Sequence, residues 1–257
     1  MTDAERVAAQ RANALFDAHR DDPEFGYRLL VDEARDAGQP MADRTAWRLC
    51  SSNQWWSVFG KKRSTKNRPG PPAHDDRVQR DFTATGPNQL WLTDITEHRT
   101  REGKVYMCAV KDVWSNRLVG YSISSRMKAR LAVQALEHAV DTRARQGVDV
   151  AGCIVHSDRG SQFRSRKYLR ALSRHNLLGS MGQVGSSADN AAMESWFALL
   201  QKNVLDRRTW HTRDQLRIAI VTWTERTYHR RRRQARLGKL TPIEYETIMT
   251  TPATQAA

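Results

Sequence analysis

The sequence has no long hydrophobic run, and this excludes one large class of protein. No stretch of about 18 consecutive apolar residues occurs in the 257-residue chain, so we expect no membrane span. The first ten residues, MTDAERVAAQ, lack the apolar stretch behind a positive start that a secretory signal needs. The hydrophobic share is nevertheless 39%, which is enough for an ordinary folded core.

Cysteine is also scarce. The three cysteines, Cys50, Cys108 and Cys153, are odd in number and form no Cys-x-x-Cys pair. This pattern indicates neither a disulfide framework nor a zinc knuckle. A reducing cytoplasm fits such a chain best.

Acidic residues are few compared with basic ones. The chain has 28 Asp and Glu against 42 Lys and Arg, which gives a net charge of +14 and a pI near 10.2. Such an excess favours a polyanionic partner, either nucleic acid or an acidic membrane. Because no basic amphipathic helix with a strongly apolar face stands out, we prefer nucleic acid. We therefore expect a cytoplasmic, nucleoid-associated protein with no membrane partner.

Composition divides the chain into four segments. Residues 1–59 are expected to be helical and helix-turn-helix-like, although a plain helical subdomain fits equally well. Residues 60–87 form a basic linker rich in Pro and Gly, which either is solvated or lies on phosphates. Residues 88–205 form an α/β core, and residues 206–257 form a helical basic extension.

Within the core, short runs of aromatic and branched residues alternate with helical patterns. Strands are predicted at 89–96, 104–110, 118–124, 153–156 and 177–181, with helices at 128–145, 166–175 and 190–205. The predicted order is βββαβαβα. Helix 213–231 follows, and Thr241, Pro242 and Glu244 predict a capping box for a last short helix.

Three acidic residues stand in unusual places. Asp94 lies within an apolar strand pattern, where an unpaired carboxylate is costly. Asp158 stands where a short apolar strand ends, and Glu194 lies about one turn inside a helix among apolar neighbours. Taken singly, they could be a salt-bridged structural aspartate, a turn aspartate and an exposed helical glutamate.

Taken together, the three carboxylates predict a metal site. A strand, a strand end and a helix can converge on one point of a mixed sheet. Converging carboxylates repel one another and favour cations, and hard oxygen ligands suit Mg²⁺ or Mn²⁺. Two such ions can activate an attacking hydroxyl and stabilise the leaving oxygen in phosphoryl transfer.

Several stretches resemble a known family. They are QLWLTDIT at 89–96, HSDRGSQF at 156–163, DNAAMESWF at 189–197, YHRRRR at 228–233 and LGKLTPIEY at 237–245. The sequence resembles the transposases of bacterial insertion sequences encoded in two overlapping frames, within the DDE and retroviral-integrase-like superfamily. Thirty-five residues separate Asp158 from Glu194, which is the spacing of that family. The resemblance runs from about residue 25 to 247.

The resemblance implies a ribonuclease H-like mixed sheet flanked by helices, behind a small N-terminal helical domain. It implies that Asp94, Asp158 and Glu194 are catalytic and bind two Mg²⁺ or Mn²⁺ ions. The reaction would be hydrolysis of one DNA strand, followed by attack of the freed 3′-hydroxyl on another phosphodiester. The expected partners are the element's DNA ends, target DNA, further copies of the chain and an upstream-frame helix-turn-helix protein, fused or separate.

Other residues are expected around this centre. His156 and Asn190 are candidates for orienting the metal ligands. The candidate DNA contacts are Gln201, Lys202, Arg230, Arg231, Arg232 and Arg233. Gln201 lies seven residues after Glu194 and so projects from the same helix face. The sequence departs from the family pattern at Ala188, Gln201, His229 and Gln234.

Two other functions remain open from the sequence. The chain could be a decayed or repurposed DNA-binding protein without catalysis. It could also be a general metal-dependent nuclease that ignores element ends. The presence of all three acids at the family spacing favours the transposase.

Overall fold

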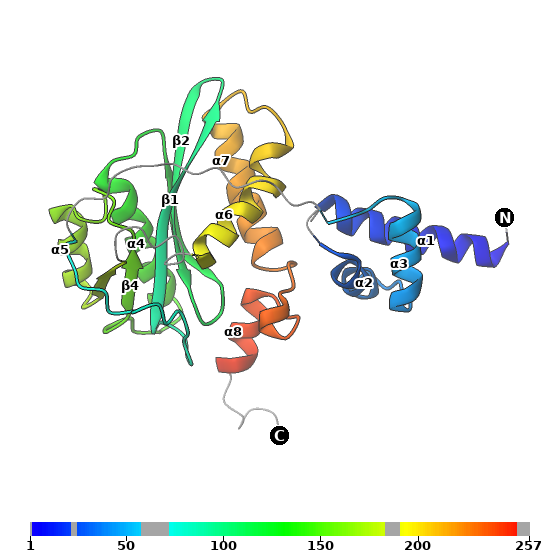
Figure 1. Cartoon of the computed structure of the whole chain (residues 1–257), viewed down its shortest axis with the longest axis horizontal. Coiled ribbons are helices and arrows are strands. Elements are labelled where there is room, and N and C mark those ends of the chain that lie inside the picture. The colour runs from blue at the N-terminus through cyan, green and yellow to red at the C-terminus, as the bar shows by residue number, and fades with distance from the viewer. Residues whose placement is uncertain (1, 22–24, 58–71, 183–190, 251–257) are drawn as a thin grey trace. The chain divides into compact units, whose positions relative to one another are not determined.

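The computed structural model describes residues 2–21, 25–57, 72–182 and 191–250. The chain divides into two compact units, Met1–Ser64 with Ala198–Arg208 and Thr65–Phe197 with Thr209–Ala257. The elements are drawn in Figure 1. Among the residues described, no helix is long and apolar enough to cross a membrane.

Three helices form the N-terminal part of the first unit: α1 (Asp3–Asp21), α2 (Tyr27–Asp36) and α3 (Asp43–Ser52). They share a small apolar core that includes Leu15, Phe25, Leu30, Ala34, Ala46 and Cys50. Leu15 is buried, but Val7 and Phe16 are exposed because only one side of α1 is covered.

The second unit is built on a five-stranded sheet in the order β3-β2-β1-β4-β5. The strands are β1 (Leu90–Thr100), β2 (Gly103–Asp112), β3 (Leu118–Ser124), β4 (Ile154–Ser157) and β5 (Leu178–Met181). The first three form an antiparallel meander, β4 runs parallel to β1, and β5 runs parallel to β4. This mixed sheet confirms the predicted strand order, and β1 ends four residues later than expected because its polar end pairs with β2.

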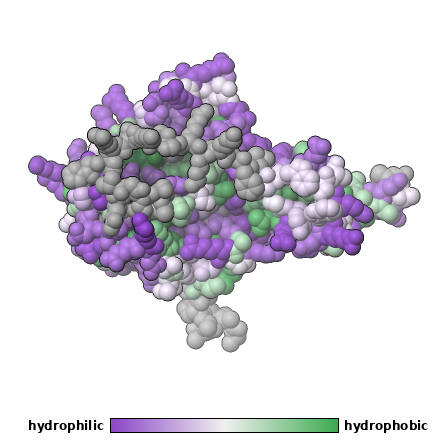
Figure 2. Space-filling model, in the orientation of Figure 1, coloured by the Kyte–Doolittle hydropathy of each residue, from purple (hydrophilic) through white to green (hydrophobic). Residues whose placement is uncertain are grey.

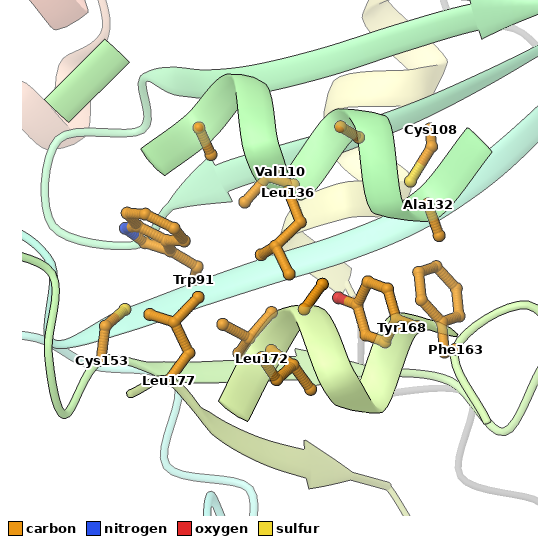
Figure 3. Packing of buried hydrophobic residues seen from close by; sticks show 14 of the residues in the cluster. Trp91, Cys108, Val110, Ala132, Leu136, Cys153, Phe163, Tyr168, Leu172 and Leu177 are labelled. Carbon is orange, nitrogen blue, oxygen red and sulfur yellow. The ribbon is translucent and has the colours of Figure 1, made fainter. Parts of the chain in front are cut away.

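Two helices cover one face of the sheet. These are α4 (Ala129–Ala144) and α5 (Arg166–Arg174), and the apolar residues of α4 recur at spacings of three and four. Their side chains pack with Trp91, Cys108, Val110 and Val155 from the strands (Figure 3). The approach of α4 to β3 is close enough to require glycine at 120, because a Cβ there would lie 2.4 Å from the Ala135 carbonyl oxygen.

Helix α6 (Ala191–Asn203) begins in the same unit and carries Trp196. The Trp196 ring packs against Trp223 and Tyr228, with ring centroids 6.3 and 6.0 Å away. Those two residues lie in a π-helical turn, Trp223–Tyr228, that continues α7 (Arg213–Thr222). Short 3₁₀ turns, Leu205–Arg207 and Ala235–Leu237, complete the helical elements with α8 (Pro242–Thr250).

The capping box predicted for the last helix is confirmed. The Thr241 N–H donates to the Glu244 carboxylate at 2.8 Å, and the Glu244 N–H donates to Thr241 Oγ1 at 3.3 Å. The two residues thus satisfy each other's backbone donors at the start of α8.

Part of the predicted linker packs on the sheet. Residues 58–71 lie outside the described residues, so most of the linker's basic stretch has no structural account. Beyond it, the Arg77 N–H donates to Ser180 Oγ at 2.9 Å, and the Met181 N–H donates to the Asp75 carbonyl at 3.4 Å. These bonds cover β5, which is the last strand of the sheet. The predicted boundary at residue 87 stays a prediction.

A buried ionic cluster ties the C-terminal helix to the sheet. Arg143 on α4, which is 3% exposed, donates to Asp112 at 3.0 Å and to Glu246 on α8 at 2.7 Å. Arg117 reaches the same Glu246 at 2.6 Å. Burial alone would raise the pKa of Glu246, but the hydrogen bonds and charges of Arg143 and Arg117 bring it to about 2. The carboxylate is therefore ionised and depends on its arginines.

Replacing Arg143 by methionine should lower the free energy of unfolding by about 3–5 kcal/mol, because it leaves the buried charge of Asp112 without an arginine and leaves Glu246 with Arg117 alone. Denaturant unfolding followed by tryptophan fluorescence measures this loss. The control is Arg174→Met, which removes an arginine that is 67% exposed from its pair with Glu137. It should cost no more than about 1 kcal/mol. Equal costs for the two variants would contradict this account.

Candidate active site

Asp94 and Asp158 are brought together by the pairing of two parallel strands. Leu92 of β1 lies opposite His156 of β4. Asp94 follows two residues later within β1, and Asp158 follows two residues later, directly after the end of β4. Side chains two residues apart share a face of the sheet, and neighbouring strands lie about 4.8 Å apart. The two carboxylates therefore lie side by side on the face of Leu92. That face is opposite to the one on which Trp91 packs with α4 and α5.

Short backbone contacts hold both carboxylates. The Ile95 N–H donates to Asp94 Oδ1 at 2.7 Å, and the Gly160 N–H donates to Asp158 Oδ1 at 2.9 Å. The second contact forms a tight turn directly after β4, and a Cβ on Gly160 would lie 2.9 Å from the same oxygen. Asp94 is half-buried, whereas Asp158 is exposed at the strand end.

Glu194 comes to the same face from α6. It lies in the first turn of that helix and is half-buried. The helix start is attached to the sheet by Lys111 of β2, whose Nζ donates to the Ala192 carbonyl at 3.2 Å. In Figure 1, α6 lies next to the strands β1 and β2.

The charges of Asp158 and Glu194 both act on Asp94. Burial raises the pKa of Asp94 to about 7, and the charges of Asp158 and, more weakly, Glu194 raise it in the same direction. Such a cluster of oxygen ligands fits a hard divalent cation, which would relieve the repulsion. Within the described stretches, however, no three acidic, histidine or cysteine side chains lie close enough to enclose an ion. The acids are neighbours without forming a closed cage.

Known proteins share much of this sequence and its fold. Residues 84–187 match the family described as "Integrase core domain". The chain is 36% identical over 228 residues to the transposase InsF for insertion sequence IS3A of Escherichia coli, covering 86% of this chain and 76% of that protein. The chain belongs to the insertion-sequence transposases. It is 38% identical over 223 residues to the transposase for IS629 of Shigella sonnei, covering 86% of this chain and 73% of that one.

Two solved structures share the fold of this transposase. One is the HTLV-2 integrase catalytic core domain in complex with magnesium, which is 16% identical with a TM-score of 0.50. The match covers 64% of this chain and 99% of that chain. The other is the simian T-cell lymphotropic virus intasome in complex with PP2A regulatory subunit B56 gamma, 15% identical with a TM-score of 0.52, covering 89% and 72%. The predicted ribonuclease H-like fold is confirmed, and the chain is a transposase of the DDE class, a polynucleotidyl transferase.

The candidates for orienting the ligands differ in their surroundings. His156 is buried, its Nδ1 lies 3.0 Å from Ser180 Oγ, and its ring packs edge-on against Phe82. It therefore joins β4 to β5 two residues before Asp158. Asn190 lies outside the described residues, as does Ala188.

The candidate DNA contacts in the transposase are not equivalent. Gln201 donates to the Asp206 carboxylate, and Lys202 is half-buried, which lowers its pKa. Arg230 and Arg231 are exposed, but Arg232 is only 8% exposed. Its guanidinium has little surface to present to phosphates, so a uniform role for the four arginines does not fit the structure.

Two departures from the family pattern belong to the interior. His229 Nε2 accepts from the Leu118 N–H at 3.2 Å, so its Nδ1 carries the proton and faces Glu225 at 3.3 Å. Gln234 accepts from the Asn116 side chain at 2.9 Å. Both residues hold the C-terminal segment against β3 and the turn before it.

The sequence patterns missed Lys111 and the Arg143 cluster. The signal for Lys111 was a lysine inside the apolar pattern of residues 105–113. Arg143 pairs with Asp112 and Glu246, which are 31 and 103 positions away in the sequence, and no local pattern predicts such pairing.

The raised pKa of Asp94 predicts a pH-dependent stability in chelator. The folded protein holds a proton on Asp94 up to its raised pKa of about 7, whereas the unfolded chain releases it near the ordinary aspartate pKa of about 3.8. The cost of ionising Asp94 therefore grows as the pH rises from 4 to 7 and is complete above pH 7. Asp94→Asn removes this cost, so it should stabilise the protein at pH 8 by on the order of a few kcal/mol and have little effect near pH 4.

Thermal unfolding in chelator at pH 4.5 and pH 8 measures this difference. The matched control is Asp141→Asn, which changes an exposed carboxylate on α4. A gain for Asp94→Asn that is the same at both pH values would show that Asp94 does not lie in the repulsive surroundings described here.

Proposed function

We propose that Asp94, Asp158 and Glu194 form the catalytic centre of this transposase. They would hold two Mg²⁺ or Mn²⁺ ions while one DNA strand is hydrolysed and the freed 3′-hydroxyl is joined to another strand. The observation that carries the proposal is the placement of Asp94 and Asp158 side by side on parallel strands, with Glu194 approaching on the same face. The family membership of the chain supports the reaction class.

Each acid has a distinct task in this proposal. Asp94 and Asp158 are neighbours on the sheet, and each would bridge the two ions or bind one of them. Glu194 would bind one ion from the helix. A bound divalent ion supplies a Lewis acid that activates a hydroxyl and stabilises the leaving oxygen. The backbone bonds from Ile95 and Gly160 leave the remaining carboxylate oxygens of the two aspartates available for that purpose.

The distribution of charge supports DNA binding by the catalytic unit and the C-terminal segment. Residues 1–57 contain seven Arg and ten acidic residues, so the whole positive excess lies in residues 58–257. Most of the coloured surface in Figure 2 is hydrophilic. The helix-turn-helix-like role of residues 1–59 remains a proposal. It would have to use α3, where Arg44, Trp47 and Arg48 are exposed.

In the C-terminal segment we assign phosphate contact to the exposed Arg230 and Arg231, because Arg232 is buried and Arg233 is half-buried and donates to the Lys239 carbonyl at 3.0 Å. Such contacts position DNA without selecting its sequence. The double variant Arg230→Ala, Arg231→Ala should weaken binding to all sequences alike and reduce the salt slope by roughly one per lost contact. An unchanged slope with altered sequence preference, measured by fluorescence anisotropy, would exclude this role.

The proposal extends to the partners and their location. The substrates would be element ends and target DNA, bound by more than one copy of the chain in association with the nucleoid. An upstream-frame helix-turn-helix protein, fused or separate, would recognise the ends. Size-exclusion chromatography with light scattering, with and without end DNA, tests whether more than one copy of the chain binds the DNA. A single copy on paired ends would contradict this part of the proposal.

Removing any one of the three carboxylates should abolish both cleavage and strand transfer. The variants are Asp94→Asn, Asp158→Asn and Glu194→Gln, and each should retain DNA binding because no basic residue is changed. Activity on labelled end DNA should require Mg²⁺ or Mn²⁺. The matched control is Asp141→Asn, which should be fully active.

Full activity in chelator, or in any of the three variants, would overturn the assignment. Comparing element ends with random DNA separates the transposase from a general nuclease. DNA binding without any metal-dependent cleavage by the wild type would favour a protein that has lost catalysis.

A further inference from the structure

Lys111 is a buried lysine where the strand pattern leads one to expect an apolar residue. It lies in β2 between Val110 and Asp112 and is 6% exposed. The pairing of β2 with β3 shifts register between Val110 and Lys111, which marks an irregularity at this position. Such irregularities redirect side chains, often near active sites.

The position of Lys111 relates it to the candidate catalytic face. Lys111 pairs with Leu92, and Asp94 pairs with Ala109, so Lys111 and Asp94 are diagonal neighbours on the same face of the sheet. The Lys111 Nζ donates to the Ala192 carbonyl at 3.2 Å. Ala192 is in the first turn of α6, two residues before Glu194. One side chain thus links the strand next to Asp94 to the helix that carries Glu194.

Fold stability does not explain a lysine here. Burial, together with the charge of Arg236, lowers the pKa of Lys111 to about 7, which means that the charged form is disfavoured in this place. A buried polar group costs free energy unless its hydrogen bonds compensate. A methionine would fill similar space without that cost. What lysine adds over methionine is the hydrogen-bond donor to the Ala192 carbonyl.

We propose that Lys111 is a positioning residue, which fixes the first turn of α6 on the sheet and thereby places Glu194 beside Asp94 and Asp158. This inference rests on the proposed function, because it gives Glu194 a role at the metal centre. It assigns no contact between Lys111 and DNA or metal. The lysine acts through the helix backbone.

The test compares Lys111→Met with wild type and with Lys104→Met in the full chain. Lys104 lies in the same strand, is exposed and pairs with Glu97. Hydrogen exchange in chelator should show faster exchange in Lys111→Met confined to the amides of residues 195–197, which bond to the carbonyls of the first turn of α6, with the melting temperature unchanged or higher. The Mg²⁺ concentration for half-maximal strand transfer should rise roughly tenfold. Lys111→Gln keeps a shorter donor, so its exchange rate and its Mg²⁺ requirement should lie between those of wild type and Lys111→Met. Lys104→Met should match wild type in both.

Three results would overturn the inference. One is unchanged exchange in α6, another is faster exchange spread over the whole sheet with a lower melting temperature, and the third is local loosening without a change in Mg²⁺ dependence. If Lys111→Met does not fold, the same readouts on Lys111→Gln decide.

Glu194→Gln separates this inference from the proposed function. Full activity of that variant removes Glu194 from the centre, whereas the exchange data still show whether Lys111 fixes the helix.

Discussion

The burial of Asp94 beside two other carboxylates is the constraint on which the proposed centre depends. Asp94 is held next to Asp158 by the pairing of β1 with β4, and Glu194 approaches from α6. Burial, and then the charges of Asp158 and Glu194, raise the pKa of Asp94 to about 7. Without a cation the arrangement opposes folding, and the remainder of the unit has to hold it together. A cation that neutralises the cluster would reverse the sign of this contribution.

Tertiary contacts within the unit provide that support. On one face, α4 and α5 cover the apolar core of Trp91 and Val110. At the other end of the unit, Arg143 and Arg117 bind Glu246 of α8, and His229 joins the backbone of β3 to Glu225. These interactions are buried and connect distant parts of the chain, so the C-terminal segment is part of the scaffold of the catalytic unit.

The sequence predicted what local periodicity and short motifs can carry. The five strands, the helices and the capping box of Thr241 and Glu244 follow from alternation and end signals, and all are found. The family resemblance and the three acids came from motifs. Local patterns could not show that Phe16 is exposed, that Arg232 is buried, or that Lys111 reaches Ala192, because each depends on which element lies opposite. The packing of residues 73–82 on β5 was missed for the same reason, since a stretch with linker composition gives no period to recognise.

Whether the three acids hold divalent metal can be tested in a crystal structure grown with Mn²⁺. Anomalous scattering at the manganese edge locates bound ions without assumptions about the ligands. The account predicts two peaks about 3.5–4 Å apart, with Asp94 and Asp158 as ligands and Glu194 bound to one of the ions. Ions bound only elsewhere on the chain, or no ion between Asp94 and Asp158 at saturating Mn²⁺, would contradict the metal-binding role of the three acids.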